Sequence, residues 1–261
     1  MTPTPPVLAA RDLAAGHGRR TVVPALTLDV APRTVTALVG PNGSGKSTLL
    51  MTLARVLPRH GGEVLLDGRP MGRHSSREIA RRLGVLPQTA VVPVGATVRE
   101  LVEQGRYPQR GPWAMLRPQD DAPLHRALEL TGLSALAGRR LDTLSGGERQ
   151  RAWIAMTLAQ ETGVLLLDEP TTYLDVRHQI DLMRLVEHLR DDHDITVVMV
   201  LHDLNQAARY ADRIVALRDG RILADGPPAE VLTSATLQAA FDVDAVVLDD
   251  PVSGRPLFVA R

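Results

Sequence analysis

The stretch that most restricts what this chain can fold into is GPNGSGKST, from Gly40 to Thr48. It fits the pattern G-x-x-x-x-G-K-[ST], in which main-chain amides wrap phosphate groups and the lysine reaches the outermost ones. An apolar segment at 35–39 reads as a strand leading in, and 48–53 reads as a helix leading out, whose N-terminus attracts anions. We therefore predict a phosphate-binding loop (P-loop) made of Gly40, Pro41, Asn42, Gly43, Ser44, Gly45, Lys46, Ser47 and Thr48.

Lys46 is the only lysine among the 30 basic residues, and the rest are arginine. A guanidinium is a flat fork, whereas an ammonium is a compact point charge that suits a phosphate cradle. A bias towards arginine explains the other basic residues, but it does not explain why the one exception lies in this loop. The position of Lys46 therefore strengthens the prediction of a nucleotide site.

The composition sets bounds on the class of protein. With 261 residues, 44% of them hydrophobic and 23% charged, the chain can bury a large core, and we expect one α/β domain with or without an inserted subdomain. The 30 acidic and 30 basic residues balance, which argues against nucleic acid as the main partner. The absence of cysteine excludes disulfides, thiolate metal sites and cysteine nucleophiles.

The sequence predicts neither a secretion signal nor a membrane span. The N-terminus is rich in proline and has no basic flank and no apolar core of signal type. The longest apolar run, around 197–201, is far short of the roughly 18 residues needed to cross a bilayer. We therefore expect a cytoplasmic protein, for which any work at a membrane needs another chain.

The order of apolar and polar segments predicts the fold class. Continuous apolar strands at 164–167 and 196–201 flank an amphipathic helix at 175–190, and such alternation is typical of a parallel sheet covered by helices on both faces. Short strands at 7–13 and 22–28 predict an N-terminal antiparallel part. We expect an α/β fold, a P-loop NTPase core with a mostly parallel sheet.

Between 97 and 143 the pattern changes to helical periodicity around a loop rich in Gly, Pro and Arg at 105–118. We interpret this as an inserted helical subdomain. Asp219-Gly220 then predicts a hairpin, and the tail holds a short helix and two strands. The chain is accordingly predicted as a single domain, 1–261, with a core at 7–96 and 144–232, a helical subdomain at about 97–143 and a C-terminal extension at 233–261.

Asp168 and Glu169 directly follow the apolar strand at 164–167. Two charges at the edge of a core need a partner, and a bound cation would supply one. Asp168 suits the holding of Mg²⁺ through water near the phosphates, and Glu169 suits the role of general base towards the attacking water. The alternative is an acidic turn that faces solvent.

Ser145-Gly146-Gly147 opens a predicted helix. A hydroxyl and bare amides at a helix N-terminus can bind an anion, although the same residues also fit a cap followed by a glycine pair. Because the P-loop already provides for one nucleotide, a second phosphate site suggests that two copies of the chain engage in trans, head to tail.

His202 and Gln88 each follow an apolar strand. Parallel sheets bind their ligands at the C-terminal ends of strands. We therefore expect His202 to bond a terminal phosphate oxygen and Gln88 to lie in a similar place. A purely structural role is the alternative for each.

Six motifs, in this order, resemble the nucleotide-binding subunit of an ABC transporter. They are the P-loop, Gln88 after a strand, LSGGERQ at 144–150, LDEP at 167–170, Leu174-Asp175 and His202. The similarity covers essentially the whole chain, and the six motifs together are highly specific. The resemblance implies an ABC ATPase that binds and hydrolyses ATP, with Mg²⁺ as the metal.

The resemblance also implies roles for the P-loop and the strand ends. Lys46, Ser47 and Thr48 bind phosphates and Mg²⁺, and the metal set is Ser47, Gln88 and Asp168. Gln88 also senses the γ-phosphate and signals to membrane subunits.

The remaining motifs receive roles in the same way. Glu169 activates water and His202 contacts the γ-phosphate. The segment Ser145, Gly146 and Gly147 clamps the ATP of a partner subunit. Asp175 orders the dimer interface.

One position departs from the family pattern. The family usually stacks adenine on an aromatic residue, often tyrosine, in the turn after the first strand, and here that place holds His17. An imidazole can stack but offers a smaller face, which implies weaker or shared adenine binding. An exposed loop histidine without a role is the alternative.

Four further segments are similar to importer subunits for iron–siderophore complexes, which are related to those for haem and vitamin B12. They are 105–108, 171–175, 201–207 and 250–254. This resemblance implies a homodimer on the cytoplasmic face of the membrane, with two permease subunits on other chains and, indirectly, a substrate-binding protein. Closure of the dimer would push on the permeases through the Gln88 loop and the segment 97–143.

Two other classes remain as alternatives. A soluble ABC ATPase without a transport role, in cluster assembly, translation or DNA upkeep, would usually carry a second nucleotide domain or a long coiled-coil insertion, and neither is seen. A nucleotide-sensing regulator without catalysis is disfavoured by the Asp168-Glu169 pair. A haem or vitamin B12 importer is the alternative within the transporters.

Overall fold

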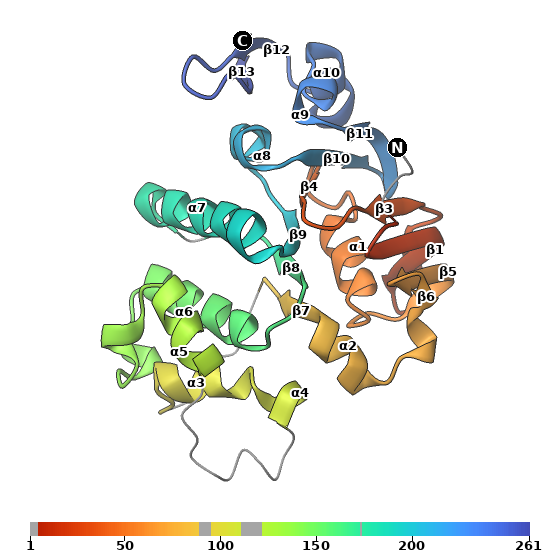
Figure 1. Cartoon of the computed structure of the whole chain (residues 1–261). Coiled ribbons are helices and arrows are strands. Elements are labelled where there is room, and N and C mark those ends of the chain that lie inside the picture. The colour runs from red at the N-terminus through yellow and green to blue at the C-terminus, as the bar shows by residue number, and fades with distance from the viewer. Residues whose placement is uncertain (1–4, 89–94, 111–121, 173) are drawn as a thin grey trace.

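The computed structural model describes residues 5–88, 95–110, 122–172 and 174–261. Its centre is a sheet in the order β11-β10-β4-β9-β8-β7, in which neighbouring strands are parallel except β10 and β11 (Figure 1). This confirms the mostly parallel sheet, and the predicted hairpin is β10–β11. The strands are β4 (Val35–Val39), β7 (Leu83–Leu86), β8 (Val164–Asp168), β9 (Thr196–Val200), β10 (Arg213–Arg218) and β11 (Arg221–Gly226).

A second, antiparallel sheet lies at the N-terminal side, in the order β2-β1-β5-β6 with β3 paired to β1. The predicted strand 22–28 is wrong, because Pro24 has no N–H to continue a ladder and the chain breaks into two short strands there. The first strand is longer than predicted and bulges at Ala15/Gly16. The strands are β1 (Leu8–His17), β2 (Arg20–Val23), β3 (Leu28–Val30), β5 (Arg59–Leu66) and β6 (Arg69–Pro70).

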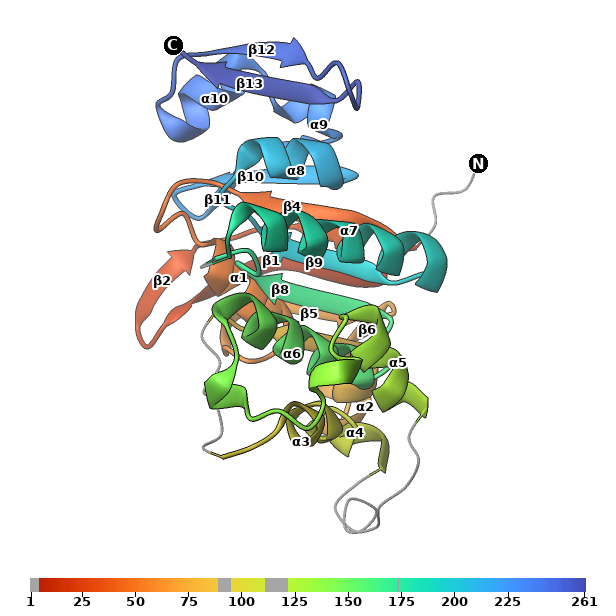
Figure 2. The ribbon, with the colours of Figure 1, turned by 90° about the vertical axis from the view of Figure 1, so that its left-hand side faces the viewer.

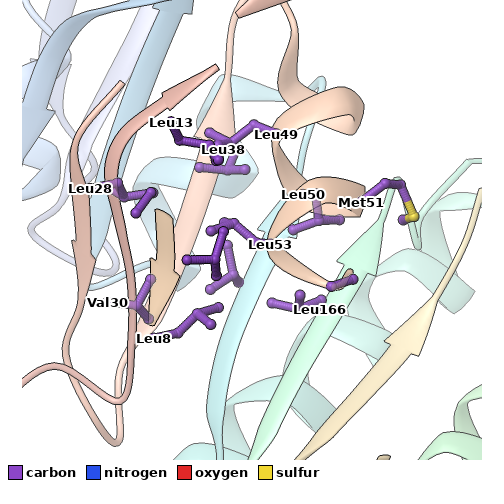
Figure 3. Packing of buried hydrophobic residues seen from close by; sticks show 14 of the residues in the cluster. Leu8, Leu13, Leu28, Val30, Leu38, Leu49, Leu50, Met51, Leu53 and Leu166 are labelled. Atoms are coloured by element: carbon purple, nitrogen blue, oxygen red, sulfur yellow. The ribbon is translucent and has the colours of Figure 1, made fainter. Parts of the chain in front are cut away.

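Helix α1 (Lys46–Leu53) packs between the two sheets. Figure 3 shows Leu49, Leu50 and Leu53 of this helix among side chains of β1 and of the central sheet, such as Leu13 and Leu38. Almost every residue of α1 is buried, as expected for a helix without a solvent face. The P-loop therefore starts from a rigid, enclosed support.

Helices α6 (Gly146–Ala159), α7 (Val176–His193) and α8 (Leu204–Tyr210) cover the opposite face of the central sheet (Figure 2). Alternate strand residues divide the two faces, since Leu166 packs on the α1 side and Leu165 on the α7 side. The two predicted phosphate-binding helices, α1 and α6, thus belong to opposite faces.

The described parts of the segment 97–143, which are 97–110 and 122–143, are mostly helical and pack with α6 as a separate apolar cluster beyond β7 (Figure 1). The loop predicted at 105–118 is wrong at 107–110, which form α4. Main-chain hydrogen bonds from Gln109 and Arg110 to the carbonyl oxygen of Arg106 close this turn. Residues 111–118 lie outside the described part. The elements are α3 (Val98–Gln104), α4 (Tyr107–Arg110), α5 (Ala122–Leu130), η3 (Ser134–Leu136) and η4 (Leu141–Thr143).

Between β6 and β7 the chain forms η1 (Met71–Arg73) and α2 (Ser76–Arg82). The sequence Ser75-Ser76-Arg77-Glu78 is typical of a capping start for a short helix, and α2 begins at a capping box of Ser75 and Glu78. The C-terminal part is α9 (Pro228–Val231), α10 (Ser234–Phe241) and the hairpin β12 (Ala245–Asp249) with β13 (Pro256–Ala260). Asn205 of α8 exchanges two hydrogen bonds, of 3.0 and 3.3 Å, with the main chain of Phe258. The division into core, subdomain and extension stays a prediction.

None of the helices in the described ranges combines the length and the apolar character that a bilayer span requires.

Candidate nucleotide-binding site

The P-loop joins β4 to α1, and its three glycines, Gly40, Gly43 and Gly45, all have positive φ values. Gly45 is the N-cap of α1 with a φ of 99°, a conformation that side chains disfavour. A Cβ on Gly40 would lie 2.2 Å from the carbonyl oxygen of Leu217, so only glycine lets the loop pass β10. A Cβ on Gly43 would meet nothing within 4 Å. The loop is thus pinned to the sheet at one end and open to a ligand in its middle.

Lys46 is the first residue of α1, and only 5% of it is exposed. Its Nζ donates hydrogen bonds to the carbonyl oxygens of Gly40 at 2.9 Å and Pro41 at 3.0 Å. Burial lowers the pKa of Lys46, whereas the charges of Glu169 and Asp168 raise it. An ammonium has three donors. The two carbonyls hold the amine inside the loop and use two donors, which leaves the third for a phosphate oxygen.

Ser47 and Asp168 lie far apart in the sequence and meet beside the P-loop. Ser47 Oγ donates to Asp168 Oδ1 at 2.8 Å, and Asp168 is 4% exposed. Burial raises the pKa of Asp168, while the hydrogen bond from Ser47 lowers it. A cation at this carboxylate would offset the cost of burying its charge.

These two oxygen ligands fit Mg²⁺, which typically takes one or two protein oxygens together with phosphates and water. Within the described ranges, no group of three or more His, Cys, Asp or Glu could hold a metal by itself. A metal at Ser47 and Asp168 would therefore complete its coordination with the nucleotide.

Glu169 is fixed by three side chains. Its Oε2 accepts hydrogen bonds from Gln88 Nε2 at 2.7 Å and from Thr172 Oγ1 at 3.2 Å, and its Oε1 lies 2.7 Å from His202 Nε2. The side chain is 11% exposed. Its backbone φ is 50°, a conformation that a residue with a side chain adopts at an energetic cost. The carboxylate is therefore held in one orientation immediately beyond β8.

The strand order explains why Gln88, Glu169 and His202 meet. Strands β7, β8 and β9 are parallel neighbours, so their carboxyl ends lie at one edge of the sheet. Each of the three residues follows its strand by one or two positions. The structure brings them together, and their roles in catalysis stay predictions. For Gln88 the contact is with Glu169, and its place in the metal set also stays a prediction.

His17 lies at the end of β1, beside the first turn of α1. Its Nε2 is 3.2 Å from Thr48 Oγ1, and the residue is exposed. The ring thus lies next to the P-loop, and its stacking on adenine stays a prediction.

The segment Ser145-Gly146-Gly147 lies away from this cluster, at the start of α6 on the other face of the sheet. Ser145 forms a capping box, in which its Oγ accepts from Glu148 N at 3.2 Å and its N–H donates to Glu148 Oε2 at 2.8 Å. The cap that sequence offered as the alternative is therefore present. Ser145 and Gly146 are nevertheless exposed, so the helix N-terminus is open to a partner.

Asp175 caps α7 and is two-thirds exposed, with its Oδ1 accepting from His178 N at 2.9 Å. Sequence reasoning missed the residues that hold the loop before it. Thr172 bonds Glu169, and Gln179 Nε2 donates to Leu174 O at 3.0 Å. Thr172 could have been found, because a hydroxyl three residues after an acid is within reach. The partner of Gln179 could not, since Gln206 comes from another helix, 2.8 Å away.

Comparison with known proteins identifies the family of this fold and site. A sequence model described as ABC transporter matches residues 23–172. The chain belongs to the ABC transporter family. It is an ATP-binding subunit of this family, and the family's activity is ATP hydrolysis coupled to transport.

Relatives of this ABC subunit match over nearly their full length. The ferric enterobactin transport ATP-binding protein FepC of Escherichia coli (strain K12) is 47% identical over 99% of this chain and 96% of that protein. The iron(3+)-hydroxamate import ATP-binding protein FhuC of Bacillus subtilis (strain 168) is 42% identical over 96% and 93%. Among solved structures, an inward-facing metal-chelate type ABC transporter gives a TM-score of 0.83 at 27% identity, covering 98% of this chain and 97% of that one.

The buried charge of Asp168 predicts a conflict between stability and function. The pKa of Asp168 is higher in the folded chain than in the unfolded chain. At a pH above both values the ionised carboxylate therefore lowers the free energy of unfolding, and this cost disappears as the pH falls through the folded pKa. Asp168→Asn should therefore raise the free energy of unfolding of the nucleotide-free chain at pH 8 by about 0.5–1 kcal/mol. The gain is modest because the hydrogen bond from Ser47 already offsets part of the cost of the buried charge.

Urea unfolding at pH 8 and at pH 4.5 measures this, with exposed Asp181→Asn as the matched control. The difference from wild type should shrink at the lower pH. A variant less stable than wild type at pH 8 would contradict the argument. The same variant should lose magnesium-dependent ATPase activity.

Proposed function

We propose that this ABC ATPase powers the import of iron–siderophore complexes, as two copies that work with two permease subunits on separate chains. The observation that carries the catalytic part is the position of Glu169, fixed by Gln88 and His202 at the edge of the sheet that also holds the P-loop. A base, a phosphate cradle and polar groups for the terminal phosphate thus share one site.

The residues of this site divide the work. The P-loop amides and Lys46 bind the phosphates, and Lys46 offsets their charge. Mg²⁺, when bound at Ser47 and Asp168, supplies positive charge that stabilises the phosphates during transfer. Glu169 takes the proton of the attacking water, and His202 holds the carboxylate in line and contacts the γ-phosphate.

The position of the N-terminus of α6 supports our proposal that two copies of the chain work together. Its N-terminus is exposed but belongs to the face of the sheet opposite to α1, so the same chain cannot easily use both sites on one ATP. In our proposal Ser145, Gly146 and Gly147 of one copy close over the ATP in the P-loop of the other, and Asp175 lies at the contact. ATP then joins the copies, and hydrolysis separates them.

Coupling to the permeases passes through Gln88. This residue bonds Glu169 directly and also begins the segment that leads to α3. A permease that moves the helices α3 to α6 would therefore shift the hydrogen bond to the general base. We place the chain at the cytoplasmic face of the membrane, held there by the permeases.

The cargo class rests on the relatives. FepC and FhuC are named for transport of ferric enterobactin and of iron(3+)-hydroxamate. The cargo itself passes through the permeases and is delivered by a substrate-binding protein, so this chain would select it only through its partners.

The test is the ATPase activity of the chain reconstituted in lipid discs with its permeases. Binding protein loaded with a ferric catecholate, a ferric hydroxamate, haem or vitamin B12 is added in turn. We expect stimulation several-fold above unloaded binding protein with a ferric siderophore. Stimulation by haem or vitamin B12 alone would reassign the cargo, and a chain that binds no permease would belong to the non-transport ABC ATPases.

A further inference from the structure

His178, in the first turn of α7, touches two motifs that the sequence separates. On one side its Nδ1 donates to Asp175 Oδ1 at 2.8 Å, in addition to the bond from its main-chain N–H to the same oxygen. On the other side, a Cβ on Gly147 would lie 2.9 Å from its Cγ and 3.1 Å from its Cδ2 and Nδ1. The imidazole therefore rests directly on the main chain of Gly147.

The contact with His178 explains, from within the same chain, why residue 147 is a glycine. Its backbone is ordinary helix, so conformation does not demand glycine there. A methyl group would instead collide with the root of the His178 side chain, which cannot swing away while Nδ1 is bonded to Asp175. The absence of a side chain at 147 is thus matched to the presence of a ring at 178.

Gln179, the residue after His178, connects the first turn of α7 to the loop that follows Glu169. Gln179 Nε2 bonds the carbonyl of Leu174, at the end of the loop whose Thr172 bonds Glu169. The first turn of α7 therefore holds both the start of α6 and the loop after the general base.

We propose that His178 is a positioning residue, which fixes the N-terminus of α6 and Asp175 as one unit so that a second copy meets both in a set geometry. This inference rests on the proposed function, because it assigns His178 to the face that closes over the partner's ATP. Loss of the residue disturbs closure and turnover but leaves the P-loop of the same chain intact.

Two substitutions separate the contacts of His178. His178→Phe keeps a ring against Gly147 and loses the bond to Asp175, whereas His178→Asn keeps a donor near Asp175 and loses the ring. Exposed His188, which pairs with Asp192 on the same helix at 2.6 Å, provides the control His188→Ala.

In the reconstituted transporter each His178 variant should lower kcat for ATP about tenfold, as expected for loss of one bond to a charged group or of one packed contact. ATP affinity of the isolated chain and its melting temperature should stay near wild type, and His188→Ala should change kcat less than twofold. Wild-type kcat in both His178 variants would overturn the inference, while an inactive wild-type transporter would count against the proposed function itself.

A rescue experiment with a double variant tests the contact between Gly147 and His178 more directly than the single variants do. Gly147→Ala should reduce kcat by about 100-fold, more than the roughly tenfold loss in the His178 variants, because the methyl group collides with the ring. Adding His178→Ala, which makes room for the methyl group, should bring the loss back to about tenfold. If Gly147 is needed only because a nucleotide approaches it, the double variant will be no better than Gly147→Ala, and our assignment of His178 is wrong.

Discussion

Glu169→Gln is expected to slow ATP hydrolysis by about 10²–10⁴-fold, the usual contribution of a general base, and to leave ATP binding intact. The amide cannot accept the proton of the attacking water. The P-loop, with Lys46, Ser47 and Asp168, is unchanged, so nucleotide still enters. If two copies close over ATP, the variant should accumulate as an ATP-bound dimer that light scattering detects.

The control is Glu129→Gln, an exposed acid on α5 that removes the same charge away from the site. It should hydrolyse ATP at the rate of the wild type. Single-turnover kinetics separate the chemical step from product release. Turnover at the wild-type rate in Glu169→Gln would reject Glu169 as the base and point to water activation by another group.

Lys46→Ala should lower the affinity for ATP at least about 100-fold, equivalent to roughly 2.7 kcal/mol. The amine is buried within the loop and bonded to Gly40 and Pro41, so it is already placed where phosphates would lie. Its removal deletes a charged donor from an enclosed site, where such groups contribute most. Isothermal titration with a non-hydrolysable ATP analogue measures the loss.

Lys46→Arg tests whether charge alone is enough. A guanidinium keeps the charge but is larger and flat, whereas the amine of Lys46 is buried and bonded to two loop carbonyls. We therefore expect most of the affinity to be lost in this variant too. Arg184→Ala, an exposed change on α7, serves as the control for loss of a positive charge. Unchanged ATP binding in Lys46→Ala would reject the phosphate cradle.

Local patterns were enough to predict most of the fold. Apolar runs gave β8 and β9, the capping box gave the start of α2, and Asp219-Gly220 gave the β10–β11 hairpin. The errors came from local backbone chemistry. Pro24 split a predicted strand, and α4 formed in a stretch whose composition favoured a loop.

The candidate site was predictable to a similar degree and for a definite reason. Residues placed just beyond parallel strands converge because the sheet aligns their ends, which brought Gln88 and His202 to Glu169. Contacts between side chains of separate helices carry no such rule. The ring of His178 on Gly147 and the Gln179–Gln206 bond depend on how α6, α7 and α8 pack, which no periodicity specifies.

The single lysine makes this site chemically addressable without any mutation. Since the pKa of its amine is lowered by burial, a larger share of Lys46 is neutral and nucleophilic in mild alkali than of an ordinary lysine. Reductive methylation with ¹³C-formaldehyde would then leave one side-chain resonance, apart from the terminal amine, and its shift would report directly on whether nucleotide occupies the loop.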